Sequence, residues 1–173
     1  PEVLARLHAE HPRIRPRVHD MLPEDVERWV ADGALDLGFL PRPPARPDLV
    51  AVDAMATPNL IVAAPGPKQP WQELGFVVPR FFRRELPISL DGWPDDRFPR
   101  RIVAEVEMLG TAIQFCEAGL GAALLPELAI REKLAAGRLV VVADPPIPIE
   151  ERLWIAWRKR VRPRPAAREL LRA

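Results

Sequence analysis

The clearest pattern of hydrophobic and polar positions lies in residues 109–126, with the sequence LGTAIQFCEAGLGAALLP. Ile113, Cys116 and Leu120 recur at helical spacing, which predicts an amphipathic helix. Gly119 is suited to the positive φ that ends a helix, and the apolar run after it predicts a buried strand. A helix that leads straight into a buried strand is a unit of an α/β fold. The glycines of this joint serve either a tight turn or the close approach of a ligand.

Comparable patterns predict helices and strands along the rest of the chain. Apolar positions at helical spacing predict helices at residues 1–11, 23–33, 127–136 and 163–171, with short helical turns at 71–74 and 89–93. Alternating or continuous apolar runs predict strands at 14–18, 35–40, 49–54, 59–64, 76–79, 102–106, 139–142 and 152–157. Because strands alternate with helices, we expect an α/β fold with mostly parallel sheets.

Two proline-rich crossings, at residues 65–70 and 143–148, divide the chain. They predict a first lobe made of residues 1–74 together with 143–173, and a second lobe made of residues 75–142. This arrangement is typical of a protein that bends at a hinge and binds a ligand in a cleft between its lobes, at the carboxyl ends of the strands.

The composition is that of a soluble globular protein. Of the 173 residues, 48% are hydrophobic and 28% are charged, which suits one large domain or two small lobes. The apolar runs are too short to span a membrane, and no secretion leader opens the sequence. Cys116 is the single cysteine, so no internal disulfide can form and we expect a cytoplasmic protein. The net charge of +1 argues against a strong field for nucleic acid, although the carboxyl-terminal end is basic.

Little in the sequence supports catalysis. One serine, two threonines and no tyrosine leave few hydroxyl nucleophiles. The three histidines have no partners at metal-ligand spacing, and Cys116 lies on the apolar stripe of its helix, as an inert core thiol does. We therefore expect no enzyme activity, no metal and no cofactor.

Six segments, in order along the chain, resemble the effector-binding domain of LysR-type transcriptional regulators. They are PEVLARLHAEHP, VERWVADGALDLGF, PWQELGFVVP, EVEMLGTAIQFCEAGLGAALLPE, LAAGRLVVV and RLWIAWRK. The resemblance implies a two-lobed, periplasmic-binding-protein-like (type 2) fold with a small-molecule effector in the interlobe cleft. It also implies a winged helix-turn-helix for promoter DNA. A homodimer or tetramer is expected, in which the first helix and strand of one subunit meet the second lobe of its partner.

The sequence departs from the family pattern in two ways. The family's first strand and its DNA-binding helix-turn-helix would precede Pro1, so we expect this sequence to be part of a longer protein. Met108 stands where the family commonly has a small hydroxyl or polar residue.

The resemblance also assigns the effector-binding residues by position. They are Met21, Leu22, Phe39, Leu40 and Pro41 in the first lobe, and Pro79, Arg80, Phe81, Met108 and Thr111 in the second. Arg80 is either a bidentate ligand for a carboxylate or a surface arginine. Phe81 either stacks on an aromatic effector or packs in the core, and Met108 either lines the site or packs in the core. Thr111 either donates to the effector or caps its helix.

These residues favour an apolar or aromatic effector, with a carboxylate held by Arg80, over a sugar. The function we expect is effector sensing for a DNA-binding regulator. A free-standing solute-binding protein of related fold is the alternative. A small α/β enzyme is a third reading, which no nucleophile–base pair, phosphate loop or metal motif supports.

Overall fold

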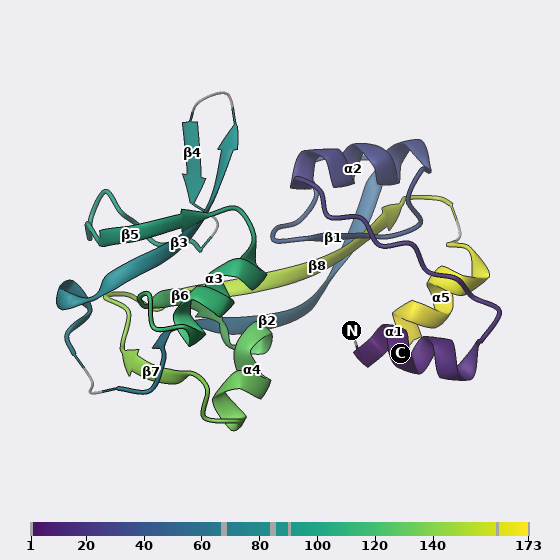
Figure 1. Ribbon diagram of the computed structural model, residues 1–173. Helices are drawn as coiled ribbons and strands as arrows, with labels where there is room; N and C mark the ends of the chain where they lie inside the picture. Colours follow the sequence, from purple (N-terminus) through teal and green to yellow (C-terminus); the bar gives the residue numbers. More distant parts are fainter. Residues whose placement is uncertain (1, 67–68, 84–85, 90, 162, 173) are drawn as a thin grey trace. The chain divides into compact units, whose positions relative to one another are not determined.

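The computed structural model describes residues 2–66, 69–83, 86–89, 91–161 and 163–172 of an α/β chain (Figure 1). Its helices are α1 (Glu2–Glu10), α2 (Pro23–Asp32), α3 (Leu109–Glu117), α4 (Glu127–Ala135) and α5 (Pro165–Arg172), with a short 3-10 helix, η1 (Trp71–Glu73). Its strands are β1 (Gly38–Leu40), β2 (Leu49–Ala63), β3 (Gly75–Arg83), β4 (Leu86–Ser89), β5 (Arg101–Val106), β6 (Ala123–Pro126), β7 (Val140–Ala143) and β8 (Glu150–Arg158).

The chain forms two compact units whose boundaries differ from those expected. The first unit consists of Pro1–Met55 and Arg152–Ala173, and the second consists of Ala56–Glu151. Residues 56–74 and 143–151, expected in the first lobe, therefore belong to the second unit. The physical reason is that β2 is one continuous strand, where the sequence predicts two strands. Its carboxyl-terminal half pairs with β6 and β7 of the second unit.

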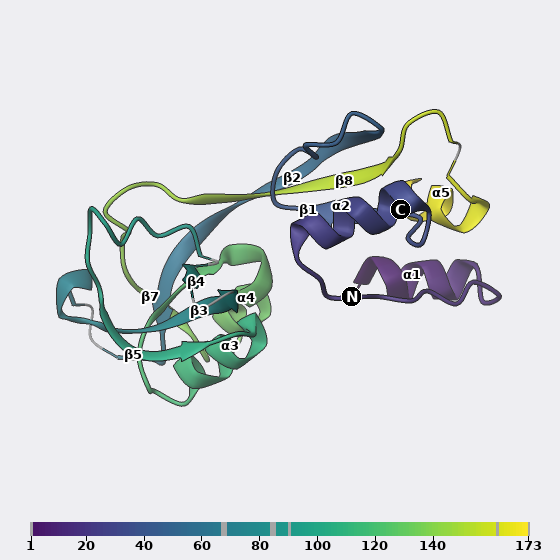
Figure 2. The ribbon, with the colours of Figure 1, turned by 90° about the horizontal axis from the view of Figure 1, so that it is seen from above.

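In the first unit, α2 packs on β1, and α1 lies beside α5 (Figures 1 and 2). β1 pairs with β8 in the antiparallel sense. Gly33, with a φ of 78°, ends α2 in the left-handed conformation that glycine adopts without strain. The core of this unit consists of Val26, Val30, Leu40, Leu49 and Ala156, with Met21 and Trp154 packed against them.

In the second unit, β3 lies between β4 and β5, and α3 and α4 contact β6. Gly121 approaches β3 so closely that an added Cβ would lie 2.6 Å from the carbonyl oxygen of Gly75. The backbone there pairs directly, because the Ala122 amide donates to Gly75 and the Val77 amide donates to Ala122. A glycine is therefore needed at position 121 because the backbone there lies against the backbone of β3. Gly119 has a φ of 79°, as its predicted role at the helix end requires.

The expectation of mostly parallel sheets is wrong for most of the described pairings. β1 with β8, β2 with β6, β2 with β7 and β3 with β4 are antiparallel, whereas β3 with β5 is parallel. The reason lies in the path through α4. The strands that it joins, β6 and β7, run in the same direction, but β2 lies between them and is antiparallel to both. The alternation of helices and strands correctly predicts that β6 and β7 run in the same direction. It does not predict that β2 lies between them.

Two further local predictions are wrong. Residues 14–18 form no strand among the described residues, because Pro16 has no N–H to donate to a sheet. Residues 89–93 form no helix where they are described: Ser89 ends β4, and the Asp91 side chain accepts the amide hydrogen of Trp93 in a turn. The helices predicted at 1–11, 23–33 and 127–136 are confirmed to within about two residues at each end.

Candidate functional site

The candidate residues of the first unit lie where β1 ends and where α2 begins. Side chains alternate along β1, so Phe39 is 50% exposed while Leu40 is buried in the core. Pro41 follows on the exposed side. Leu22 is the N-cap residue of α2, and its side chain accepts no hydrogen bond from the first turn, where the Asp25 amide donates to the Leu22 carbonyl oxygen instead. The surface offered to a ligand is therefore Phe39 and Pro41, with Leu40 behind them.

A buried carboxylate that the sequence analysis missed holds the loop after β1. Glu27 of α2 is 5% exposed, and it accepts hydrogen bonds from Arg42 Nη1 at 3.2 Å and from the Ala45 amide at 3.1 Å. Residues 41–47 include four prolines, so the loop has only three backbone N–H groups. One of these three, the Ala45 amide, donates to Glu27, and this hydrogen bond ties the loop to α2. The only signal in the sequence is a glutamate next to the apolar stripe of its helix.

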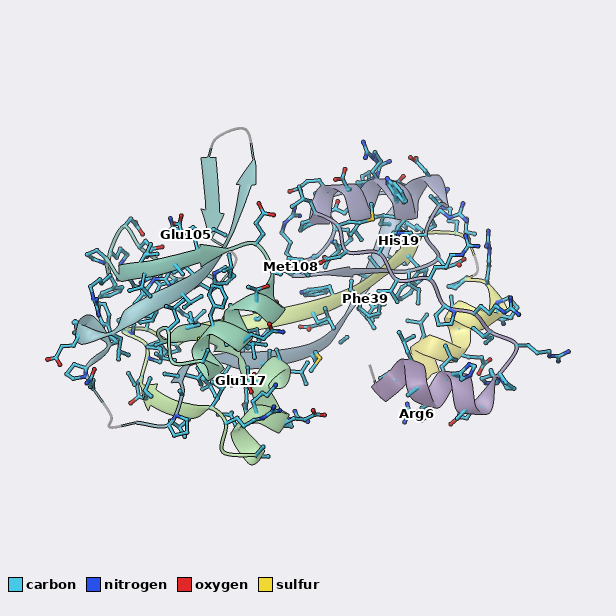
Figure 3. All side chains as sticks on the ribbon, viewed as in Figure 1. Arg6, His19, Phe39, Glu105, Met108 and Glu117 are labelled. Atoms are coloured by element: carbon cyan, nitrogen blue, oxygen red, sulfur yellow. The ribbon has the colours of Figure 1, made fainter. Side chains whose placement is uncertain are left out.

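The candidate residues of the second unit lie within β3 and between the end of β5 and the start of α3. The parallel register pairs Pro79 with Val106, the last residue of β5, while β3 continues to Arg83. Pro79 is buried, whereas Met108, two residues after β5, is 64% exposed (Figure 3). Met108 is the N-cap residue of α3, and its carbonyl oxygen accepts the amide hydrogen of Thr111. Thr111 is therefore not the N-cap, and the exposed Met108 is not a core residue. The side chain of Phe81 lies outside the described part of the chain.

Arg80 is bound to acidic residues of its own unit. Its Nη1 lies 2.7 Å from Glu105 Oε1 and its Nη2 lies 3.2 Å from Asp95 Oδ2. The side chain is 16% exposed, so it is not the surface arginine that one reading predicts. Arg80 lies within β3 and not at the strand end that the sequence predicts, because β3 continues to Arg83 in its pairing with β4, and carboxylates of the protein occupy the guanidinium.

Arg100 continues this network into the core. Its side chain is fully buried, and it donates to Asp91 at 2.6 Å and twice to Asp95, at 2.9 and 3.0 Å. Its guanidinium lies 4.7 Å from the centre of the Trp93 ring, within the range of a cation–π interaction. Burial opposes ionisation of Asp95, but the hydrogen bonds and charges of Arg100 and Arg80 outweigh it and lower the pKa of Asp95. Asp95 is therefore ionised at neutral pH.

Outside this network, the thiol of Cys116 is buried in the core of the second unit. Burial, with a smaller effect of the Glu117 charge, raises the pKa of the Cys116 thiol to about 12, so the thiolate is scarce at neutral pH. No group of three histidine, cysteine or acidic side chains is placed to bind a metal among the described residues. In that same part of the chain, none of the helices combines the length and apolar character needed to cross a membrane.

A family comparison decides what kind of domain carries these residues. The model of the LysR substrate binding domain matches residues 1–173. The chain belongs to this family. The LysR substrate-binding domain is the effector-binding, regulatory part of LysR-type transcriptional regulators, so the resemblance of the six segments is confirmed and a free-standing solute-binding protein is not favoured.

Solved LysR-type regulators share the fold. The bromide-bound regulatory domain of HypT from Salmonella typhimurium is 18% identical, with a TM-score of 0.75 over 98% of this chain and 85% of that chain. DarR from Vibrio fischeri in complex with DNA is 13% identical, with a TM-score of 0.77 over 99% of this chain and 62% of DarR. LysG from Corynebacterium glutamicum with bound effector Arg is 18% identical, with a TM-score of 0.66 over 98% of this chain and 60% of LysG. No curated protein sequence matches the chain.

Proposed function

We propose that this LysR substrate-binding domain senses a small-molecule effector through the two groups of residues at its strand ends. One group is Met21, Leu22, Phe39, Leu40 and Pro41, and the other is Pro79, Arg80, Phe81, Met108 and Thr111. The observation that carries the proposal is the family match over the whole chain. It is supported by apolar side chains exposed beside helix starts in both units, Phe39 at 50% and Met108 at 64%.

The effector class we propose is an apolar or aromatic molecule with one carboxylate. Exposed Phe39 and Met108 favour contact with apolar groups, because burying them removes apolar surface from water. The start of α3 favours an anion, since its first N–H groups lack intrahelical partners and its first turn holds no acidic residue. Thr111 is the one hydroxyl among the candidate residues, which argues against a sugar.

The wider role we propose is regulation of transcription rather than catalysis. This chain spans 62% of DarR, a protein whose structure was solved in complex with DNA. We propose that a winged helix-turn-helix in the parent protein binds promoter DNA, and that the protein works in the cytoplasm, where that DNA lies. The high pKa of the buried Cys116 thiol argues against this cysteine as a catalytic nucleophile.

We also propose that the intact protein forms a homodimer, with residues 14–18 of one subunit against β5 of its partner. Residues 14–18 are extended and mostly exposed, and Val18 is 76% exposed. β5 is an edge strand of the three-stranded sheet, and Ile102 is 37% exposed on it. The charges of the units are complementary: the first has 15 basic and 11 acidic residues, and the second has 10 basic and 13 acidic residues.

The effector proposal is tested by thermal shift of the intact protein against phenylacetate, other aromatic and aliphatic acids, and sugars. A ligand at a hundred times its dissociation constant stabilises the folded state by about 2.7 kcal/mol. We expect an acid to do this, and we expect Phe39→Ala and Met108→Ala each to weaken binding about tenfold, through roughly 1.4 kcal/mol of lost contact.

Leu128→Ala is the matched control, because Leu128 is also exposed, at 43%, but lies on α4 outside the candidate residues. Equal losses in Met108→Ala and Leu128→Ala would contradict the proposed site. Stabilisation by sugars alone would contradict the proposed effector class.

A further inference from the structure

The ion-pair network of the second unit runs from the core to the surface. It consists of Asp91, Arg100, Asp95, Arg80 and Glu105, in that order of contact. The side chains of Asp91 and Arg100 are buried, at 1% and 0% exposed, whereas those of Asp95, Arg80 and Glu105 are partly exposed, at 30%, 16% and 34%. Glu105 is the most exposed member of the network and lies on β5.

The two carboxylates on Arg80 are held differently. Asp95 receives hydrogen bonds from Arg80 Nη2 and from both Nε and Nη2 of Arg100, so two guanidinium groups fix it in place. The described partner of Glu105 is Arg80 Nη1, at 2.7 Å. Asp95 is thus a fixed part of the structure, whereas Glu105 can turn toward water when its single partner binds another anion.

The exchange of one carboxylate for another on Arg80 leaves the charge of the network unchanged. Glu105 is the more exposed partner of this ion pair, at 34% against 16% for Arg80, so water can solvate its carboxylate when it is released. A ligand carboxylate on Arg80 Nη1 would restore the same pairing with the same charge.

We infer that Glu105 occupies, in the ligand-free domain, the position on Arg80 that the carboxylate of the effector takes. The inference rests on the proposed function and deepens it, since it names the anion-binding group and its internal competitor. Glu105 sits one strand away from Arg80, on the parallel neighbour β5, and the register pairs it with Val78. When Glu105 is displaced, only its side chain has to move, and the backbone pairing between β5 and β3 stays intact.

Competition by Glu105 has a measurable consequence. Glu105→Gln removes the competing charge and leaves a side chain of the same length, so a carboxylate ligand should bind more tightly. We expect about a fivefold gain, the scale of a solvent-exposed ion pair. A neutral isostere of the ligand should gain nothing, since it does not compete for the guanidinium.

The test titrates phenylacetate and phenylacetamide into the intact protein by calorimetry. The proteins compared are the unmodified protein, Glu105→Gln, Arg80→Gln, Arg80→Lys and the control Glu107→Gln, whose exposed side chain lies just after β5. We expect phenylacetate to bind Glu105→Gln more tightly than the unmodified protein, Glu107→Gln to match the unmodified protein, and both Arg80 variants to bind more weakly. Arg80→Lys keeps the positive charge that Asp95 and Glu105 contact. Weaker phenylacetate binding in this variant is therefore not explained by misfolding alone.

A second readout follows the guanidinium itself. The NMR signal of the Arg80 Nε–H should shift in Glu105→Gln, and phenylacetate should shift it in the unmodified protein. The inference is overturned if Glu105→Gln binds phenylacetate no more tightly than the unmodified protein, or does not bind it. A neutral compound that stabilises every variant equally would overturn the inference and leave effector sensing intact.

Discussion

Two arginines of the second unit show how burial decides what a charged side chain does. Arg100 is fully buried between Asp91 and Asp95 and lies against the Trp93 ring, so its charge is satisfied within the protein. Arg80 is bound to Asp95, which Arg100 also holds, and to Glu105, whose described partner is Arg80. Arg100 is therefore structural, whereas Arg80 has one partner that a ligand can replace.

Arg100→Met should destabilise the fold strongly. Removing Arg100 takes away a charged partner of the buried Asp91 carboxylate and of Asp95, and breaking a buried ion pair costs about 3–5 kcal/mol. Urea denaturation measures the change in the free energy of unfolding. Arg101→Met is the control, because the neighbouring Arg101 is exposed and should change that free energy by less than about 0.5 kcal/mol. Similar midpoints for the two variants would contradict a structural role for Arg100.

At the scale of elements, the packing of α2 on β1 requires a glycine, which has no side chain, at position 38. A Cβ added to Gly38 would lie 2.5 Å from Val26 Cγ1 and 3.0 Å from Val30 Cγ2, closer than carbon atoms pack. α2 therefore sits directly on the backbone of β1. This contact orients both the start of α2, at Leu22, and the end of β1, where Phe39 and Pro41 follow.

Gly38→Ala should cost about 1–3 kcal/mol of stability, because the added methyl group pushes α2 from the strand. Gly110→Ala is the matched control: no atom lies within 4 Å of its added Cβ, and it is in the first turn of α3. That change should be neutral or stabilise the protein by up to about 1 kcal/mol. Thermal unfolding of both variants measures the difference, and an equally stable Gly38→Ala would show that α2 can move freely.

At the scale of the whole molecule, the charges are divided between the two units. The first unit has an excess of basic residues and the second an excess of acidic residues, although the net charge is only +1. Unlike charges on separate units favour contacts between the first unit of one copy and the second unit of another. The extended residues 14–18 and the edge strand β5 supply backbone groups for such a contact.

Val18→Lys and Ile102→Lys should each weaken the homodimer about tenfold or more, because a charge would enter an apolar contact. Sedimentation velocity of the intact protein over a range of concentrations measures the dissociation constant. Val161→Lys serves as the control, since Val161 is 45% exposed on the first unit but outside the proposed contact. An unchanged dissociation constant in both variants would show that the interface lies elsewhere.

The sequence by itself determined the family, the α/β class and most of the elements. Helical spacing predicted α2, α3 and α4, and glycine predicted the ends of α2 and α3, because these signals depend on neighbours within a few residues. The six segments predicted a LysR-type effector-binding domain, and the family match over residues 1–173 confirmed it. The candidate effector residues remain a prediction from that resemblance.

Only the tertiary structure decided the strand neighbours, the unit boundaries and the partners of the charged side chains. β2 lies between β6 and β7 through pairing between segments far apart in the sequence, which local patterns do not encode. Arg80 meets Glu105, 25 residues away, and Glu27 meets Ala45, 18 residues away, for the same reason. Spacing along the chain predicts which face of an element is apolar, but the partner of a charge depends on which elements pack together.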